Sequence, residues 1–255
     1  MKLDTMTYER DGRVGRLTLS RPRLLNAMNF QGALDLNAAA EAIRDDPDVR
    51  LVLIRGAGRA FCTGIDLKQL SGGETPVAYY ESWDRALRVL EHAEKVLICA
   101  MHGYALGGGL QLALACDIRI ATGDCQMGLP AIREGIAPGL GTLRLPRFIG
   151  LGRAKRMALS GENVDGRRAL EIGMVDHLVN AETFEEEVNG LVGEYLRVCS
   201  EGTRQTKMLL NLSFDMPHGQ FFEEYLRRQR IALASPDHQE AMEAYREGRP
   251  PSFRA

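Results

Sequence analysis

The sequence predicts an α/β fold with a β-rich core and a helical C-terminal region. Two observations predict it. Through residues 1–179 of the 255-residue chain, short apolar strands alternate with amphipathic helices, which is typical of parallel β-α-β units. From Phe184 onward the apolar spacing is helical only. We therefore expect a sheet built early in the chain, with a group of helices added after it.

The elements follow in order. Alternating polarity around the turn Asp11-Gly12 predicts a hairpin over residues 8–20, and the spacing of Leu36, Ala40 and Ile43 predicts a helix over 30–44. The glycine-rich break at 71–76 precedes a helix whose apolar face carries Trp83. The other expected elements are strands at 51–55, 96–101, 117–121 and 174–179, helices at 79–93, 108–114, 184–199, 203–213 and 220–234, a turn-rich segment at 128–141, and a last helix after Ser235.

Composition excludes several classes of protein. The formal net charge is −2, so the total charge gives no indication of a nucleic-acid partner. No apolar run approaches the roughly 20 residues needed to cross a bilayer, and residues 1–10 are too polar for a signal peptide. The five cysteines lie mostly in apolar surroundings and form no cluster with histidine at metal-ligand spacing. We therefore expect a cytoplasmic protein without a metal ion or membrane segment.

Two glycine-bearing turns stand out as a candidate site. One follows the strand at 96–101 and contains Gly107, Gly108 and Gly109, directly before a helix. The other, with Gly64, follows the strand at 51–55. Free N–H groups at such turns can bind a phosphate or a developing oxyanion, and glycine allows a substrate to approach the backbone closely. A purely structural turn is the alternative. A nucleotide-phosphate site is disfavoured, because the lysine of a phosphate loop is missing.

The residues of both turns resemble the crotonase superfamily, also called the enoyl-CoA hydratase/isomerase family. The resemblance rests on residues 60–67 and 103–117, and it extends to Arg21-Pro22, Leu25-Asn26-Ala27 and the segment 138–147. It implies a crotonase-type ββα spiral with two nearly perpendicular sheets. It also implies an acyl-CoA-binding core over 1–195 and a helical trimerisation region over 196–255, in a homotrimer or a dimer of trimers.

The family's chemistry assigns roles to several of these residues. Two backbone N–H groups, of Ile65 and Gly108, would hold the thioester oxygen and stabilise an enolate. Coenzyme A would enter as part of the substrate, and no separate cofactor is implied. The positions that match its contacts are Arg23, Leu25, Thr63, Asp66, Leu67 and Lys68. Arg23 and Lys68 could pair with phosphates, or could be ordinary surface charges.

Two departures from the family pattern affect the expected reaction. A hydratase of this family uses two glutamates, and the matching positions here hold Gln111 and Ala131. Neither side chain can act as a general base, a role that typically contributes about 10²- to 10⁴-fold to the rate. Gln111 could still hold water or a polar group of the substrate, or be a helix residue without a chemical role.

Two acids could substitute for the missing glutamates. Asp84 matches the helix position at which the family's aroyl-CoA dehalogenases carry a functional histidine, although a surface ion pair with the nearby Arg88 is the alternative. Glu134 lies three residues after Ala131, and could instead be the solvent-facing partner of Arg133 or Arg144.

The sequence leaves two hypotheses about function. The first is an enzyme of the enoyl-CoA hydratase/isomerase family that stabilises a thioester enolate and acts as an isomerase or decarboxylase rather than as a true hydratase. The second is a non-catalytic subunit that binds acyl-CoA or a partner protein. Retention of the glycines at 64 and 107–109 favours the first.

Overall fold

The computed structural model describes residues 1–73 and 75–253, and its centre is a six-stranded sheet. The strand order is β1-β2-β3-β4-β6-β9. Only the predicted hairpin, β1 with β2, is antiparallel, and every later neighbour is parallel, which confirms the β-α-β reading. The strands are β1 (Met6–Asp11), β2 (Val14–Leu19), β3 (Leu51–Gly56), β4 (Val96–Met101), β6 (Ile118–Thr122) and β9 (His177–Val179).

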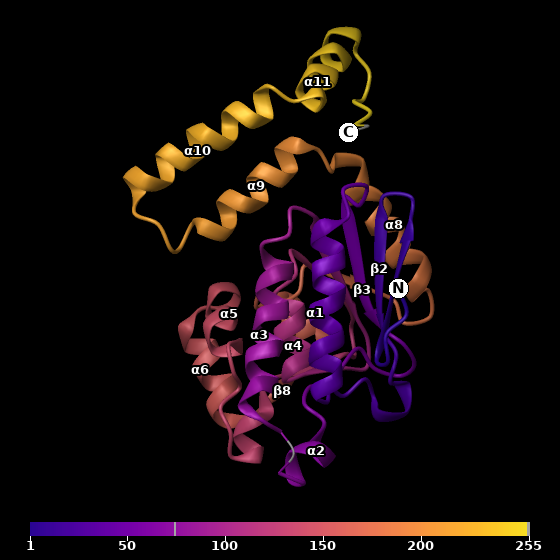
Figure 1. Cartoon of the computed structure of the whole chain (residues 1–255), viewed down its shortest axis with the longest axis vertical. Coiled ribbons are helices and arrows are strands. Elements are labelled where there is room, and N and C mark those ends of the chain that lie inside the picture. The colour runs from indigo at the N-terminus through magenta and orange to yellow at the C-terminus, as the bar shows by residue number, and fades with distance from the viewer. Residues whose placement is uncertain (74, 254–255) are drawn as a thin grey trace.

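Helices cover both faces of this sheet (Figure 1). The alternation of side chains in β3 shows how: Val52 and Ile54 belong to the core shared with α1 (Phe30–Asp45), α3 (Val77–Glu91) and α4 (Gly108–Leu114). Leu51 and Leu53 point to the other face and pack with α8 (Phe184–Val198). Burial on both faces explains why these strands are continuous apolar runs rather than alternating ones.

The resemblance implied a second sheet, but the three strands that form it were not predicted from the sequence pattern. This sheet pairs β5 (Tyr104–Leu106) with β7 (Gln126–Gly128) in parallel, and β7 with β8 (Asn163–Val164) in antiparallel orientation. Strands of two or three residues are too short to show a period in the sequence. The short helix α2 (Leu67–Ser71) was missed for the same reason, and the expected strand at 174–179 is shorter because only its last three residues pair.

The C-terminal half is helical as expected. Its helices, besides α8, are α5 (Gly141–Ile149), α6 (Leu151–Ser160), α7 (Gly166–Glu171), α9 (Glu201–Leu212), α10 (His218–Leu233) and α11 (Pro236–Glu247). Two 3₁₀ turns complete the helical elements: η1 (Pro22–Leu24) before α1, and η2 (Pro130–Glu134) before α5. Ser235 caps α11 as predicted, because its hydroxyl accepts the His238 N–H. The proposed boundary at residue 195 falls within α8, and the division into a core and a trimerisation region stays a prediction.

The last three helices project from the core (Figure 1). Helix α9 is tied to the core: the Lys207 ammonium lies 2.9 Å from the Asp117 carboxylate and also donates to the Lys95 carbonyl. Helix α10 has no buried residue and exposes large apolar side chains, namely Phe222, Tyr225, Leu226, Ile231 and Leu233. Within residues 1–73 and 75–253, no helix is long and apolar enough to cross a membrane and no group of side chains could hold a metal ion.

Candidate active site

The two glycine turns meet at one place. The segment after β3 runs beside β5: the Cys62 N–H donates to the Tyr104 carbonyl, and the Leu106 N–H donates back to the Cys62 carbonyl, both at 2.9 Å. This exchange holds the turn that contains Gly64 against the turn that begins α4. Segments 40 residues apart in the chain therefore form a single backbone surface.

Glycine is required where these turns touch. A Cβ atom on Gly64 would lie 2.8 Å from the Leu106 carbonyl oxygen and 2.9 Å from the Gly108 nitrogen, and the backbone here has a φ of +90°. A Cβ on Gly109 would lie 2.2 Å from the Cys62 carbonyl oxygen. Side chains at either position would push the two turns apart.

Two backbone donors lie at this junction without an acceptor. In the part of the chain that the structure describes, neither the Ile65 N–H nor the Gly108 N–H donates a hydrogen bond. The Gly108 N–H is free because it belongs to the first turn of α4. Gly64 directly precedes Ile65 and lies against Gly108, so both free donors are next to the same backbone contact. The arrangement is suited to binding one oxygen atom between two N–H groups.

The opening loop supports the first of these turns. The Gly64 carbonyl accepts the Met28 N–H at 2.7 Å, and the Thr63 N–H donates to the Leu25 carbonyl at 3.2 Å. Buried Asn26 completes the support, since its amide donates to the carbonyls of Ala57 and Ala60. Leu25 and Asn26 adopt left-handed backbone conformations, which for residues other than glycine are strained and occur mainly where neighbouring contacts hold them.

The six positions expected to contact coenzyme A lie in two adjacent loops. Leu25 and Thr63 are hydrogen-bonded to each other, and Arg23, Leu67 and Lys68 are exposed. Within the described residues, the charged groups of Arg23 and Lys68 form no ion pair.

The sixth position, Asp66, has structural contacts. Its carboxylate lies 3.1 Å from the Arg21 guanidinium and also accepts the Lys68 N–H at the start of α2. It therefore orders the loop that carries the other coenzyme A candidates.

Gln111 and Ala131 lie on different elements, and both are buried. Gln111 projects from α4, one turn after Gly108, and its side chain packs against the turn before α5: Cβ atoms on Gly139 and Gly141 would come within 3.2 Å of it. Its amide makes no hydrogen bond to another described residue, yet the amide atoms are not fully enclosed. Ala131 is buried in the first turn of η2. Thus the two positions expected to match the family's glutamates hold a free amide and a buried methyl group.

Asp84 is in an ion pair, but with a partner different from the one expected. Its carboxylate lies 3.4 Å from the guanidinium of Arg144 in α5, rather than pairing with Arg88 in its own helix. Arg144 also makes two hydrogen bonds to Glu91, at 2.5 and 2.7 Å, and is almost fully buried. Helical spacing could not reveal this partner, because it lies 60 residues further along the chain.

Glu134 has no such partner. Its side chain is exposed at the end of η2, and no ion pair to it exists among the described residues. The alternative pairing with Arg144 is wrong, since that guanidinium is engaged by Asp84 and Glu91. Glu134 therefore remains available to a ligand or to solvent.

Sequence reasoning placed Trp83 on the buried face of its helix but missed its position relative to the turns. Its six-membered ring meets Gly108, on which a Cβ atom would lie 3.2 Å from Cζ2 and 3.5 Å from Cε2. The indole is 4% exposed and stacks on Tyr79, and its buried N–H group has no acceptor in the part of the chain that the structure describes. An unpaired donor cannot be seen in a single sequence.

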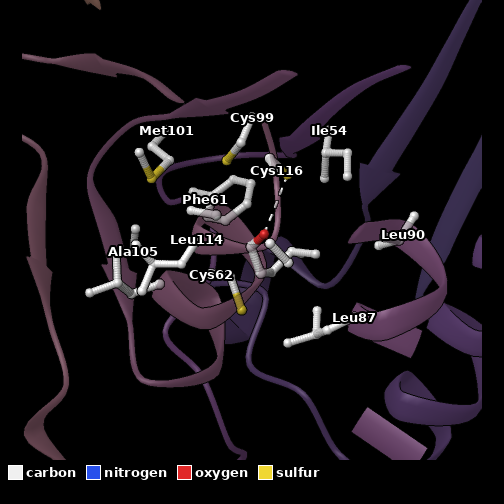
Figure 2. Close-up of a cluster of buried hydrophobic side chains, with 14 of the residues drawn as sticks. Ile54, Phe61, Cys62, Leu87, Leu90, Cys99, Met101, Ala105, Leu114 and Cys116 are labelled. Carbon is white, nitrogen blue, oxygen red and sulfur yellow. Dashed lines mark hydrogen bonds between the residues drawn. The ribbon is translucent and has the colours of Figure 1, made fainter. Parts of the chain in front are cut away.

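Cys62 belongs to the packing beneath the site. It lies with Phe61 and Ala105 in the buried cluster of Figure 2. Burial raises the pKa of its thiol to about 12, although a hydrogen bond from the Gly64 N–H opposes the shift. The thiol is thus protonated near neutral pH and is not a nucleophile there.

The comparisons with known proteins cover the whole chain. The sequence profile described as enoyl-CoA hydratase/isomerase matches residues 9–255. The chain is 34% identical over 256 residues to the "Probable enoyl-CoA hydratase" of Mycobacterium tuberculosis, covering 99% of each. It is 31% identical over 258 residues to the crotonyl-CoA hydratase of Syntrophomonas wolfei, again over 99% of each.

Solved structures agree with the sequence comparisons. The enoyl-CoA hydratase of Bacillus anthracis superimposes with a TM-score of 0.92 at 28% identity, covering 98% of this chain and 99% of the other. The resemblance found in the two glycine turns thus extends over the full length. The chain belongs to the enoyl-CoA hydratase/isomerase family, the crotonase superfamily.

Proposed function

We propose that this protein is an acyl-CoA enzyme that stabilises a thioester enolate between the N–H groups of Ile65 and Gly108. The observation that supports the proposal is the contact of Gly64, which directly precedes Ile65, with Gly108, together with the unpaired N–H groups of Ile65 and Gly108 among the described residues. Loss of one such donor typically costs about 2.7–4 kcal/mol of transition-state stabilisation. The adenine and phosphate end of the substrate would lie along the loops that carry Arg23 and Lys68.

The reaction we propose is formation of the enolate without a general base. Gln111 and Ala131 cannot remove a proton, and Asp84 is engaged by Arg144. Decarboxylation of a malonyl-type thioester needs no general base. The bond from C2 to the carboxylate breaks, carbon dioxide leaves, and the electron pair of that bond forms the enolate that the N–H groups stabilise. A proton from water or from a nearby acid then completes the product. Isomerisation of an enoyl-CoA, with Glu134 as its single acid, is the second reading.

Turnover of a thioester panel followed by mass spectrometry tests the proposal. The panel holds a 2-enoyl-CoA, a 3-enoyl-CoA, malonyl-CoA and methylmalonyl-CoA. We expect loss of carbon dioxide from a malonyl ester and very slow hydration of the 2-enoyl ester. The Gln111→Glu, Ala131→Glu double variant restores both carboxylates and should gain hydration. Efficient hydration by the unchanged protein would contradict the base-free reading, and binding without turnover of any ester would favour a non-catalytic acyl-CoA-binding subunit.

A matched pair of variants tests the oxyanion assignment. Gly108→Leu fills the space between the two turns, and we expect it to abolish turnover. Gly152→Leu makes the same change near the start of α6, where a Cβ atom would meet nothing within 4 Å. Both variants should stay folded, and only the first should lose activity. Equal turnover by the two variants would show that Gly108 is not part of the active site.

We also propose that the chain assembles as a homotrimer or a dimer of trimers. The support is α10, which carries large apolar side chains but buries none of its residues in the single chain. A soluble protein rarely leaves such a face uncovered. Light scattering after size exclusion should give three or six times the chain mass, and a monomer would contradict the assembly.

A further inference from the structure

Within the described residues, the indole nitrogen of Trp83 is a buried polar atom of the candidate site that has no hydrogen-bond partner. A buried tryptophan N–H normally finds an acceptor, and an exception requires an explanation. Trp83 is 96% buried, and no acceptor for its N–H exists among the described residues. The missing acceptor could therefore belong to the substrate.

The ring of Trp83 lies next to Gly108, one of the two proposed oxyanion donors. Cε2, the atom that carries Nε1, and its neighbour Cζ2 are the two ring atoms nearest to Gly108. The ring therefore packs against the start of α4 at the bond next to the indole nitrogen. Tyr79 stacks on the same ring at 6.5 Å with an interplanar angle of 10°. Burial raises the pKa of the Tyr79 phenol, so this packing partner stays neutral.

We propose that Trp83 donates a hydrogen bond to an oxygen atom on C3 of the acyl group and thereby selects substrates that carry one. This inference rests on the function proposed above and names its substrate class: esters with a carboxylate or carbonyl in 1,3-relation to the thioester. If the thioester oxygen is held at Gly108, the acyl carbons that follow it would lie beside the indole of Trp83. The amide of Gln111, free on the same helix, provides a second polar group there.

The neighbouring groups support an oxygen acceptor rather than a hydrocarbon chain. The unpaired groups around Gly108 are mainly donors: two backbone N–H groups, the indole N–H and one amide. The carboxylates of Asp84 and Glu91 are engaged by Arg144, so they do not compete for these donors. A saturated acyl chain would leave the indole N–H unsatisfied, which disfavours its binding.

The test uses two stable esters that differ in one oxygen. Acetoacetyl-CoA has a carbonyl at C3 and butyryl-CoA does not. Trp83 is the only tryptophan in the chain, so protein labelled with ¹⁵N-tryptophan gives a single indole N–H signal. We expect acetoacetyl-CoA to move the proton of this signal downfield, as a new hydrogen bond does, and butyryl-CoA to leave it nearly unchanged.

Calorimetry on Trp83→Phe, which keeps an aromatic ring and removes the donor, provides the second readout. We expect the affinity for acetoacetyl-CoA to fall roughly five- to tenfold, and that for butyryl-CoA to change less than twofold. Equal shifts or equal losses for both esters would assign Trp83 a packing role only, and no shift with either would also overturn the proposal. Neither measurement needs turnover, so an inactive protein that still distinguishes the esters would refute the proposed function and leave this inference standing.

Discussion

Gly64→Ala is the substitution for which the structure gives the clearest magnitude. The new methyl group would lie 2.8 Å from the Leu106 carbonyl oxygen and 2.9 Å from the Gly108 nitrogen. Comfortable separations begin near 3.5 Å, so the two turns must part by about 0.6–0.7 Å. The contacts are with backbone, so no flexible side chain can move aside to relieve them. Alanine would also be forced to a φ of +90°, a strain of about 1–3 kcal/mol.

The expected result is a large loss of activity with a moderate loss of stability. Displacing one of the two oxyanion donors should lower kcat/KM by about 10²- to 10³-fold. The assay is turnover of the thioester that the panel identifies, together with a thermal melt of the same sample. The melt separates a displaced donor from an unfolded protein.

Gly12→Ala is the matched control for Gly64→Ala. Gly12 also has a positive φ, +58°, but nothing lies within 4 Å of its added Cβ, and it sits in the β1–β2 turn away from the site. It should lower stability slightly and leave kcat/KM unchanged. If folded Gly64→Ala kept kcat/KM within about threefold of the parent, the reasoning that the two turns must touch to form the site would be refuted.

Three further predictions concern the packing around the site. Arg144→Met should lower the free energy of unfolding by about 3 kcal/mol in urea titrations, because it leaves the partly buried Glu91 unpaired; no change would mean that the pair contributes nothing. Burial raises the pKa of Asp117, while Lys207 opposes the shift, so the stability lost in Lys207→Met should grow as the pH rises and Asp117 ionises, and a loss that does not change with pH would contradict this. In the native protein, Cys62 should resist iodoacetamide at pH 8 and react only after unfolding, as followed by mass spectrometry.

Most elements of the fold could be predicted from local sequence patterns. The helix predicted at 108–114 has the observed bounds, because glycines mark its start and an apolar run defines its length. The strands at 96–101 and 51–55 were found because each is buried on both faces. The strands of the three-stranded sheet were missed, since β5, β7 and β8 are short and depend on pairing between segments far apart in the chain.

The candidate site, too, could be predicted from the sequence only in part. Its glycines were visible in the sequence because their role is local, in backbone turns. The pairing of Asp84 with Arg144 and the unsatisfied N–H of Trp83 depend on tertiary packing. Helical periodicity correctly predicted that Trp83 is buried, but it could not indicate which atoms of the ring meet Gly108.

The engagement of Asp84 by Arg144 bears most directly on the proposed reaction. A general base must be free to accept a proton from the substrate, and this carboxylate is instead bound to a guanidinium that Glu91 also holds. Without a base at these positions, bond cleavage in the substrate would supply the electron pair of the enolate, and Glu134 is left as the acid of the alternative isomerisation. Loss of carbon dioxide from a malonyl-type ester provides that cleavage, and C3 is the carbon of its departing carboxylate, which the indole of Trp83 would first bind. The absence of carboxylates at positions 111 and 131 and the unpaired N–H at position 83 are thus consistent with one substrate class.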